Sequence, residues 1–168
     1  MAGREFDRLL EQNERFAEAF DRSALTAAPL TGLAILTCMD ARIDVEDALG
    51  LRVGDAHIIR NAGGLASQDA IRSLVVSQQL LGTREIVVIG HTGCGLHGAD
   101  EDALRERVEL STGTSTEMGF GSFGNLEAMV REQVQLLLDE PTLLETEVRG
   151  LLYEVETGRL RRVEAPGP

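Results

Sequence analysis

The sequence contains very little cysteine, no tryptophan and no long apolar run. Its two cysteines could form one disulfide at most. No apolar stretch is long enough to cross a bilayer. The first residues are charged and lack the apolar core of a secretion signal. We therefore expect a cytoplasmic protein that has no membrane partner and keeps its cysteines reduced.

Basic residues are outnumbered by acidic ones. The chain has 16 Lys plus Arg against 28 Asp plus Glu, so its net charge is −12 at pH 7. Nucleic acids and anionic membranes bind basic surfaces, and this composition predicts neither as a partner. A small neutral substrate would be indifferent to the charge. The 43% hydrophobic and 26% charged content is that of an ordinary globular domain, and we expect one domain over 1–168.

Apolar, β-branched runs alternate with helical patterns along most of the chain. The predicted strands are 32–37, 56–60, 85–90, 148–155 and 159–163. The predicted helices between them are 43–49, 67–81, 100–110 and 125–139. This alternation predicts an α/β fold, with a parallel β-sheet core flanked by helices. A Thr157-Gly158 turn predicts a short antiparallel edge strand at the C-terminus.

The N-terminal segment reads as an amphipathic helix over 4–22. Its apolar residues, among them Phe6, Phe16 and Phe20, recur at helical spacing. This stripe could pack on its own domain or on a second subunit. We therefore divide the chain into an N-terminal helical arm, 1–30, and an α/β core, 31–164.

Cysteine and histidine stand where two predicted strands end. Cys38 follows 32–37, and His91 follows 85–90, three residues before Cys94. Ligands gather beyond the carboxyl ends of parallel strands, so these side chains would converge if the two strands are neighbours. Two thiolates and an imidazole suit Zn²⁺ and leave a fourth position open, which favours catalysis over a structural role. Taken alone, Cys38 could equally be a small core residue.

Asp40 and Arg42 follow Cys38 within four residues. An Arg can hold a neighbouring Asp ionised and grip its carboxylate through two hydrogen bonds. Such an Asp is either a fourth zinc ligand or an acceptor that orients a zinc-bound water. The alternative is an N-cap Asp beside a surface Arg, because helix 43–49 begins nearby.

Together these motifs resemble those of the β-class carbonic anhydrases, most closely the short prokaryotic branch. The similar stretches are Cys38 to Arg42, His91 to Cys94, Arg60-Asn61-Ala62-Gly63-Gly64, and 150–158. The resemblance runs from about 31 to 163. It implies a carbonate dehydratase, a zinc lyase that reversibly hydrates carbon dioxide to bicarbonate and a proton through zinc-bound hydroxide. It also implies a catalytic Asp40–Arg42 dyad beside the metal.

The resemblance carries further expectations. It implies that Asn61, Gly63 and Gly64 line the substrate pocket, although a plain strand–helix turn is the alternative for these residues. It implies a homodimer or a dimer of dimers, with the N-terminal helix embracing the partner. The chain has no Trp, so the Trp-containing bicarbonate regulatory site of some relatives is not expected.

Zinc lowers the pKa of bound water to about 7 in carbonic anhydrases with three histidine ligands. Two thiolates donate more charge, so we expect a smaller shift here, with Asp40 compensating by accepting a hydrogen bond from that water. If Arg42 released it, Asp40 could bind the metal and block the open position, which would give a pH switch. His57 and His97 are candidate proton shuttles, and His97 is the better placed of the two.

Two other functions stay open. A hydrolase of carbonyl sulfide or carbon disulfide on the same scaffold would keep the same zinc set and differ in its substrate channel. A non-catalytic zinc-binding module is disfavoured by Asp40 and Arg42, because a structural site needs no water-orienting carboxylate. The segment 111–124, rich in Ser, Thr and Gly, is the longest predicted loop and resembles the family least.

Overall fold

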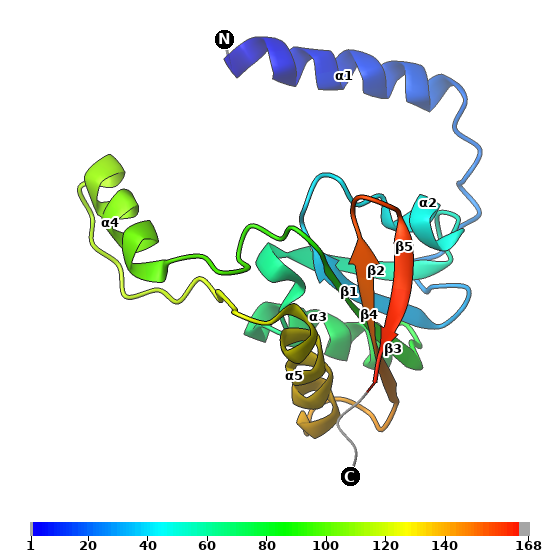
Figure 1. Cartoon of the computed structure of the whole chain (residues 1–168). Helices are drawn as coiled ribbons and strands as arrows, with labels where there is room; N and C mark the ends of the chain where they lie inside the picture. The colour runs from blue at the N-terminus through cyan, green and yellow to red at the C-terminus, as the bar shows by residue number, and fades with distance from the viewer. Residues whose placement is uncertain (1, 165–168) are drawn as a thin grey trace.

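The computed structural model describes residues 2–164 as one five-stranded sheet with helices around it (Figure 1). The strand order is β2-β1-β3-β4-β5, and every neighbouring pair is parallel except β4 and β5. The strands are β1 Leu33–Cys38, β2 Ala56–Asn61, β3 Glu85–His91, β4 Glu147–Glu154 and β5 Arg159–Val163. The predicted α/β class and the antiparallel C-terminal edge are therefore confirmed.

The helices agree with prediction to within a few residues. They are α1 Ala2–Glu18, α2 Val45–Leu49, α3 Gln68–Gln79, α4 Glu101–Thr112 and α5 Leu126–Asp139, with a 3₁₀ turn, η1, at Ala62–Gly64. The side chains of Ser67, Asp100 and Asn125 accept hydrogen bonds from backbone N–H groups in the first turns of α3, α4 and α5. Each of these helices thus begins at a capping residue, and α2 ends at Leu49, the predicted last residue, with Gly50 as its C-cap.

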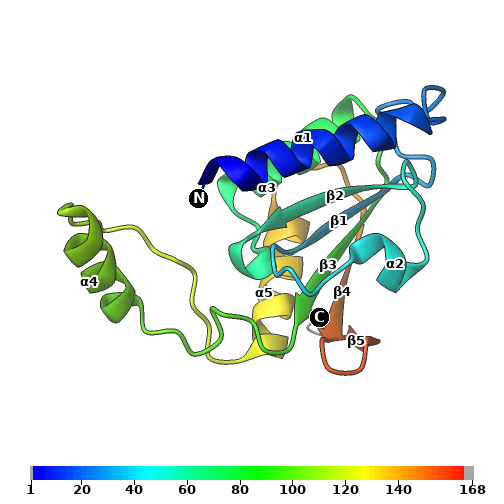
Figure 2. The same ribbon diagram turned by 90° about the horizontal axis from the view of Figure 1, so that it is seen from above.

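The two faces of the sheet carry separate apolar clusters. On one face α3 and α5 lie side by side against the strands (Figure 2), and Leu36, Leu74 and Val130 are fully buried between them. On the other face a smaller cluster around Ile35 packs beneath α2 and includes both cysteines. The cysteines therefore sit at the edge of a packed core. No helix within the described range has both the length and the apolar character needed to cross a membrane.

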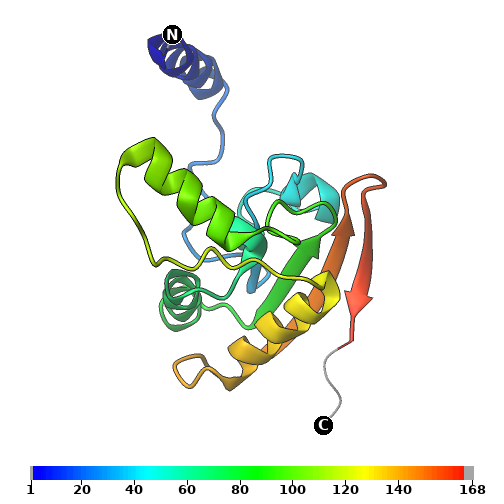
Figure 3. The ribbon, with the colours of Figure 1, turned by 60° about the vertical axis from the view of Figure 1, so that its left-hand side comes forward.

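Helix α1 stands apart from the sheet (Figures 1 and 3). It begins and ends earlier than the predicted 4–22. The predicted apolar stripe stays exposed: the exposed fractions are 63% for Phe6, 50% for Phe16 and 51% for Phe20, which lies two residues beyond the end of α1. Packing on its own domain, one of the two alternatives for this stripe, is therefore wrong.

Helix α4 and the loop after it form an excursion away from the sheet (Figure 2). The helix runs on to Thr112, so the irregular segment starts at Gly113, two residues later than predicted. The Glu101 carboxylate ties the two ends of the excursion together, because it accepts 2.9 Å hydrogen bonds from the backbone N–H groups of Gly121 and Ser122. The loop is thus anchored to the first turn of α4.

The Glu101 anchor should release in acid. Hydrogen bonds from backbone N–H groups hold the pKa of Glu101 below its ordinary value of 4.5, and the bond from Ser122 has the largest effect. A carboxylate with a depressed folded-state pKa stabilises the fold above that ordinary value, and the contribution is lost as pH falls through the folded-state pKa. The amide NMR signals of Gly121 and Ser122 should therefore titrate with a midpoint below 4.5.

The matching variants are Glu101→Ala and, as a control, Glu106→Ala on the exposed part of the same helix. Glu101→Ala should abolish that titration and speed hydrogen exchange at both amides at neutral pH, whereas Glu106→Ala should leave both unchanged. A titration that survives in Glu101→Ala would assign it to another group.

Candidate metal centre

The carboxyl ends of β1 and β3 lie side by side because the two strands are parallel neighbours. Cys38 is the last residue of β1 and His91 is the last residue of β3, so each strand ends one residue later than predicted. Cys94 follows within three residues of His91. One ligand atom from each of Cys38, His91 and Cys94 lies within 4.8 Å of the other two. The predicted convergence of the three side chains is confirmed.

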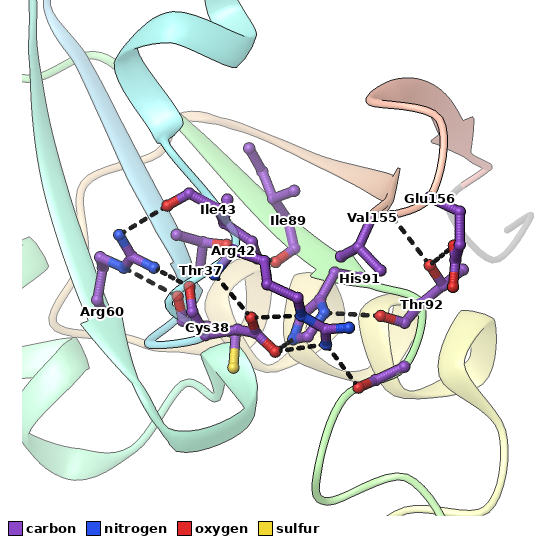
Figure 4. A network of polar contacts seen from close by, with 12 residues as sticks. Thr37, Cys38, Arg42, Ile43, Arg60, Ile89, His91, Thr92, Val155 and Glu156 are labelled. Atoms are coloured by element: carbon purple, nitrogen blue, oxygen red, sulfur yellow. Dashed lines mark hydrogen bonds and ion pairs between the residues drawn. The ribbon is translucent and has the colours of Figure 1, made fainter.

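The His91 ring is held in the orientation that a metal ligand needs. Its Nδ1 lies 2.9 Å from the carbonyl oxygen of Thr92, which can only accept, so Nδ1 carries the proton and Nε2 presents a lone pair (Figure 4). His91 is 1% exposed, and within residues 2–164 its Nε2 has no hydrogen-bond partner. Leaving a buried polar atom unpaired costs about 1–3 kcal/mol. A metal ion would satisfy this atom.

The two thiols favour a cation between them. Both are buried, and neither is in a disulfide. Burial raises the pKa of the Cys94 thiol because it disfavours a charged sulfur, and the neighbouring Cys38 raises it further because it opposes a second negative charge. A bound divalent cation reverses this, since it neutralises thiolates directly. Two sulfurs and one imidazole nitrogen, whose buried lone pair has no partner within residues 2–164, therefore fit zinc.

Asp40 and Arg42 form an ion pair beside this group. Arg42 donates from its backbone N–H and Nε to Asp40 Oδ1, at 3.0 and 2.9 Å, and from Nη2 to Oδ2 at 2.7 Å. These bonds hold the pKa of Asp40 far below its usual range. Asp40 Oδ2 lies 3.9 Å from Nε2 of His91. The carboxylate is thus ionised and next to the ligand atoms.

The alternative that Asp40 is a helix N-cap is wrong. The N-cap of α2 is Asp44, whose side chain accepts from the backbone N–H of Asp47. The guanidinium of Arg42 also reaches across to the second ligand loop, where Nη2 donates to the carbonyl of Gly93 at 2.9 Å. The Asp40–Arg42 pair therefore bridges the two segments that supply the cysteines.

Thr92 fastens the His91–Cys94 loop to the hairpin between β4 and β5. Its hydroxyl donates to Glu156 Oε2 at 2.9 Å and accepts the backbone N–H of Val155 at 3.1 Å (Figure 4). Its own backbone N–H donates to the carbonyl of Tyr153. Because the carbonyl of Thr92 receives the Nδ1 proton of His91, these contacts fix the orientation of the ring.

The turn after β2 lies directly against β1. Asn61 closes it, since its side-chain amide donates to the carbonyl of Leu65 at 2.7 Å and its Oδ1 accepts the Leu65 N–H at 2.8 Å. Gly63 and Gly64 are buried and have positive φ. The side chain of Asn61 is thus engaged within the turn itself. That Asn61, Gly63 and Gly64 line a substrate pocket stays a prediction.

Gly64→Ala should disturb the Cys38 end of β1. A Cβ at Gly64 would lie 2.9 Å from the carbonyl carbon of Thr37 and 3.0 Å from the backbone N of Cys38, where no flexible side chain can move aside. The left-handed conformation alone costs Ala about 1–2 kcal/mol. Gly82→Ala is the matched control, because Gly82 also has positive φ but has no neighbour within 4 Å of a built Cβ.

Denaturant unfolding should show a larger loss of stability for Gly64→Ala than for Gly82→Ala, and only Gly64→Ala should weaken metal retention. Equal losses in the two variants would mean that the backbone contact at Cys38 has no effect.

The remaining histidines occupy different settings. His57 lies in β2, with Nδ1 2.6 Å from Ser77 Oγ and Nε2 2.8 Å from the carbonyl of Ala27, so both ring nitrogens have partners. His97 is exposed, its ring stacks on Phe123 with centroids 5.5 Å apart, and its Nε2 lies 3.2 Å from the carbonyl of Gly124. A shuttle role for either stays a prediction.

Two residues that contact the site were given no function from the sequence. Arg60 donates to three backbone carbonyls of the loop between Cys38 and α2, and Thr92 anchors the histidine loop. The signal for Arg60 was present in the sequence. It is the one charged residue of the strand Ala56–Asn61, and it directly precedes the glycine turn. Its three acceptors are backbone atoms, and no residue pattern reveals those.

Comparison with known proteins identifies the family. The carbonic anhydrase family profile matches residues 33–111. β-Carbonic anhydrase 1 of Mycobacterium tuberculosis is 37% identical over 158 residues, which cover 94% of this chain and 96% of that protein. The chain belongs to the β-carbonic anhydrase family. A carbonic anhydrase structure from Streptococcus mutans matches this β-carbonic anhydrase with a TM-score of 0.90 and 40% identity, covering 95% of this chain and 97% of the other.

A second group of relatives is named for a different activity. A carbon disulfide hydrolase of Acidithiobacillus thiooxidans is also 37% identical, but the match covers 76% of this chain and 74% of that protein. Identity alone therefore does not separate the two groups, whereas coverage favours the β-carbonic anhydrases. The cofactor of the family is zinc, and the Cys38, His91 and Cys94 group of this chain is positioned to bind it.

Proposed function

We propose that this protein reversibly hydrates carbon dioxide to bicarbonate and a proton, with zinc held by Cys38, His91 and Cys94. The observation that supports this most is the buried Nε2 of His91, which has no hydrogen-bond partner within residues 2–164. The ligand atom of His91 lies within 4.8 Å of those of two free cysteines, and Nε2 is 3.9 Å from an ionised carboxylate. A structural zinc site needs four protein ligands and no such carboxylate. The arrangement favours an open metal position beside Asp40.

The contacts assign separate roles to Asp40, Arg42 and Thr92 around a bound zinc ion. When bound, zinc supplies a Lewis acid that makes water nucleophilic near neutral pH. Asp40 accepts a hydrogen bond from the reacting water, which keeps that proton away from the lone pair that attacks carbon. Arg42 keeps Asp40 ionised and fixed through three hydrogen bonds. Thr92 fixes His91 through the Nδ1 proton, so that Nε2 remains directed at the metal.

The test is stopped-flow carbon dioxide hydration by the zinc-loaded protein, with carbon disulfide hydrolysis measured on the same preparation. We expect carbon dioxide to be turned over and carbon disulfide to be turned over far more slowly or not at all. Hydrolysis of carbon disulfide without carbon dioxide hydration would assign the chain to the second group of relatives. Absence of both activities in zinc-loaded protein would favour the non-catalytic module.

We propose further that the protein works in the cytoplasm as a homodimer or a dimer of dimers, with 31–164 as its catalytic core and 1–30 as the arm. Two buried free thiols favour a reducing compartment. The exposed Phe6 and Phe16 of α1, with Phe20 just after the helix, form an apolar surface that a second subunit would cover.

Phe16→Asp should weaken self-association. An aromatic anchor at the centre of an interface commonly contributes about 2 kcal/mol or more, so the dimer dissociation constant should rise by roughly 30-fold or more. Glu14→Ser, a polar change on the same helix, is the control and should leave the association unchanged. Sedimentation velocity over a concentration series measures the dissociation constant of both variants. A Phe16→Asp protein with the wild-type dissociation constant would place the interface elsewhere.

A further inference from the structure

We propose that Arg60 is a positioning residue that sets the geometry of the Asp40–Arg42 pair through the backbone of the loop between β1 and α2. The inference rests on the proposed function, because it assigns Arg60 a part in the same reaction. Arg60 is neither a metal ligand nor a member of the ion pair. Its hydrogen bonds within residues 2–164 go to backbone carbonyls and not to the ligand atoms of Cys38, His91 or Cys94.

One guanidinium binds three carbonyls of this loop (Figure 4). Nε of Arg60 donates to the carbonyl of Cys38 at 2.9 Å, Nη2 to that of Asp40 at 2.7 Å, and Nη1 to that of Ile43 at 3.0 Å. Arg60 can reach them because β2 pairs in parallel with β1, which places its backbone opposite Thr37. The contacts thus span the loop from Cys38, the last residue of β1, to Ile43, which precedes the α2 N-cap.

Within residues 2–164, two backbone–backbone hydrogen bonds also hold residues 39–43. Residues 39–44 lie outside helix and strand. Besides Arg60, the backbone bonds of the loop include Met39 N–H to the Asn61 carbonyl at 2.9 Å and Ile43 N–H to the Asp40 carbonyl at 3.1 Å. A guanidinium is planar and has donors in several directions, so one side chain can satisfy three carbonyls at once. A lysine ammonium on a flexible stem cannot reproduce that fork.

The position of the loop decides where the Asp40 carboxylate lies. Arg60 fixes the Asp40 backbone, the Asp40 carboxylate binds Arg42, and Arg42 donates onward to the Gly93 carbonyl beside Cys94. Both ligand segments are therefore tied to β2 through one chain of contacts. A reacting group displaced by about 1 Å can lose roughly 100-fold in rate, so a loosened loop should slow turnover without removing the metal.

The test compares Arg60→Lys and Arg60→Gln with wild-type protein. The matched control is Arg84→Lys, since Arg84 also donates to a backbone carbonyl, that of Thr83, but lies at the opposite end of β3. Zinc content, kcat and KM for carbon dioxide hydration, and hydrogen exchange of the amides of 39–43 are measured on each. Arg60→Lys keeps the charge and carries the test if Arg60→Gln does not fold.

We expect both Arg60 variants to retain zinc, to lose roughly 10- to 100-fold in kcat with KM changed by about twofold or less, and to exchange the 39–43 amides faster. Arg84→Lys should match wild-type protein in all three. Wild-type kcat in Arg60→Lys, unchanged exchange, or loss of zinc in step with activity would each overturn the positioning role. Inactive wild-type protein would instead refute the proposed function, and the exchange data would still decide the role of Arg60.

Discussion

Replacing Cys38 with serine should remove zinc and abolish carbon dioxide hydration together. Serine is nearly isosteric with cysteine, but its hydroxyl does not ionise at neutral pH and is a poor ligand beside a thiolate and an imidazole. Cys38 is 5% exposed at the end of a central strand, so the change leaves the packing of β1 almost intact. Metal analysis and stopped-flow assays on the same sample should both fall to background.

The folded state of Cys38→Ser must be checked alongside. Circular dichroism and gel filtration should match wild-type protein, because the larger apolar cluster of the sheet contains neither cysteine. A folded Cys38→Ser protein that retains a stoichiometric amount of zinc would exclude Cys38 as a ligand. Ile86→Val, a conservative change in the larger apolar cluster, which contains neither cysteine, is a suitable control for general disturbance.

Replacing Asp40 with asparagine should give the opposite combination, with zinc retained and turnover lost. Asn has the shape of Asp but no charge, so Arg42 no longer holds it through three charge-assisted hydrogen bonds. Its amide group can also donate to the reacting water, which would turn the hydrogen bond around. Since orientation of a reacting group is worth about 100-fold or more, we expect at least that loss in kcat/KM.

The control for Asp40→Asn is a carboxylate paired with an Arg elsewhere. Asp69 on α3 forms an exposed ion pair with Arg72, and Asp69→Asn should leave both zinc content and turnover unchanged. Equal zinc content in Cys38→Ser and Asp40→Asn would contradict the assignment of ligand and orienting group. Full activity in Asp40→Asn would remove the carboxylate from the reaction.

The sequence predicted the sheet and the convergence of the ligands for a physical reason. Buried parallel strands are continuous apolar runs, and those runs end abruptly at Cys38 and His91. The capping residues Ser67 and Asn125 and the Gly50 stop also have local signatures. Each of these features depends on neighbours in the chain, and a single sequence displays them.

The features that the sequence did not predict depend on contacts between distant segments. An amphipathic stripe shows that α1 must cover something, but the stripe does not say whether the partner is its own sheet or another subunit. The bonds from Arg60 and Thr92 end mostly on backbone atoms, which every residue possesses, so residue types alone do not reveal them. The N-cap alternative for Asp40 was excluded only when the structure placed the start of α2 after Asp44.

X-ray absorption spectroscopy at the zinc edge of the purified protein tests the central claim most directly. Ligation by Cys38, His91 and Cys94 predicts two sulfur scatterers at about 2.3 Å and one imidazole nitrogen at about 2.0–2.1 Å, with one further light atom completing the tetrahedron. A first shell of nitrogen and oxygen alone would contradict the account. So would protein that is folded and active without zinc, or protein in which the two thiols are joined to each other.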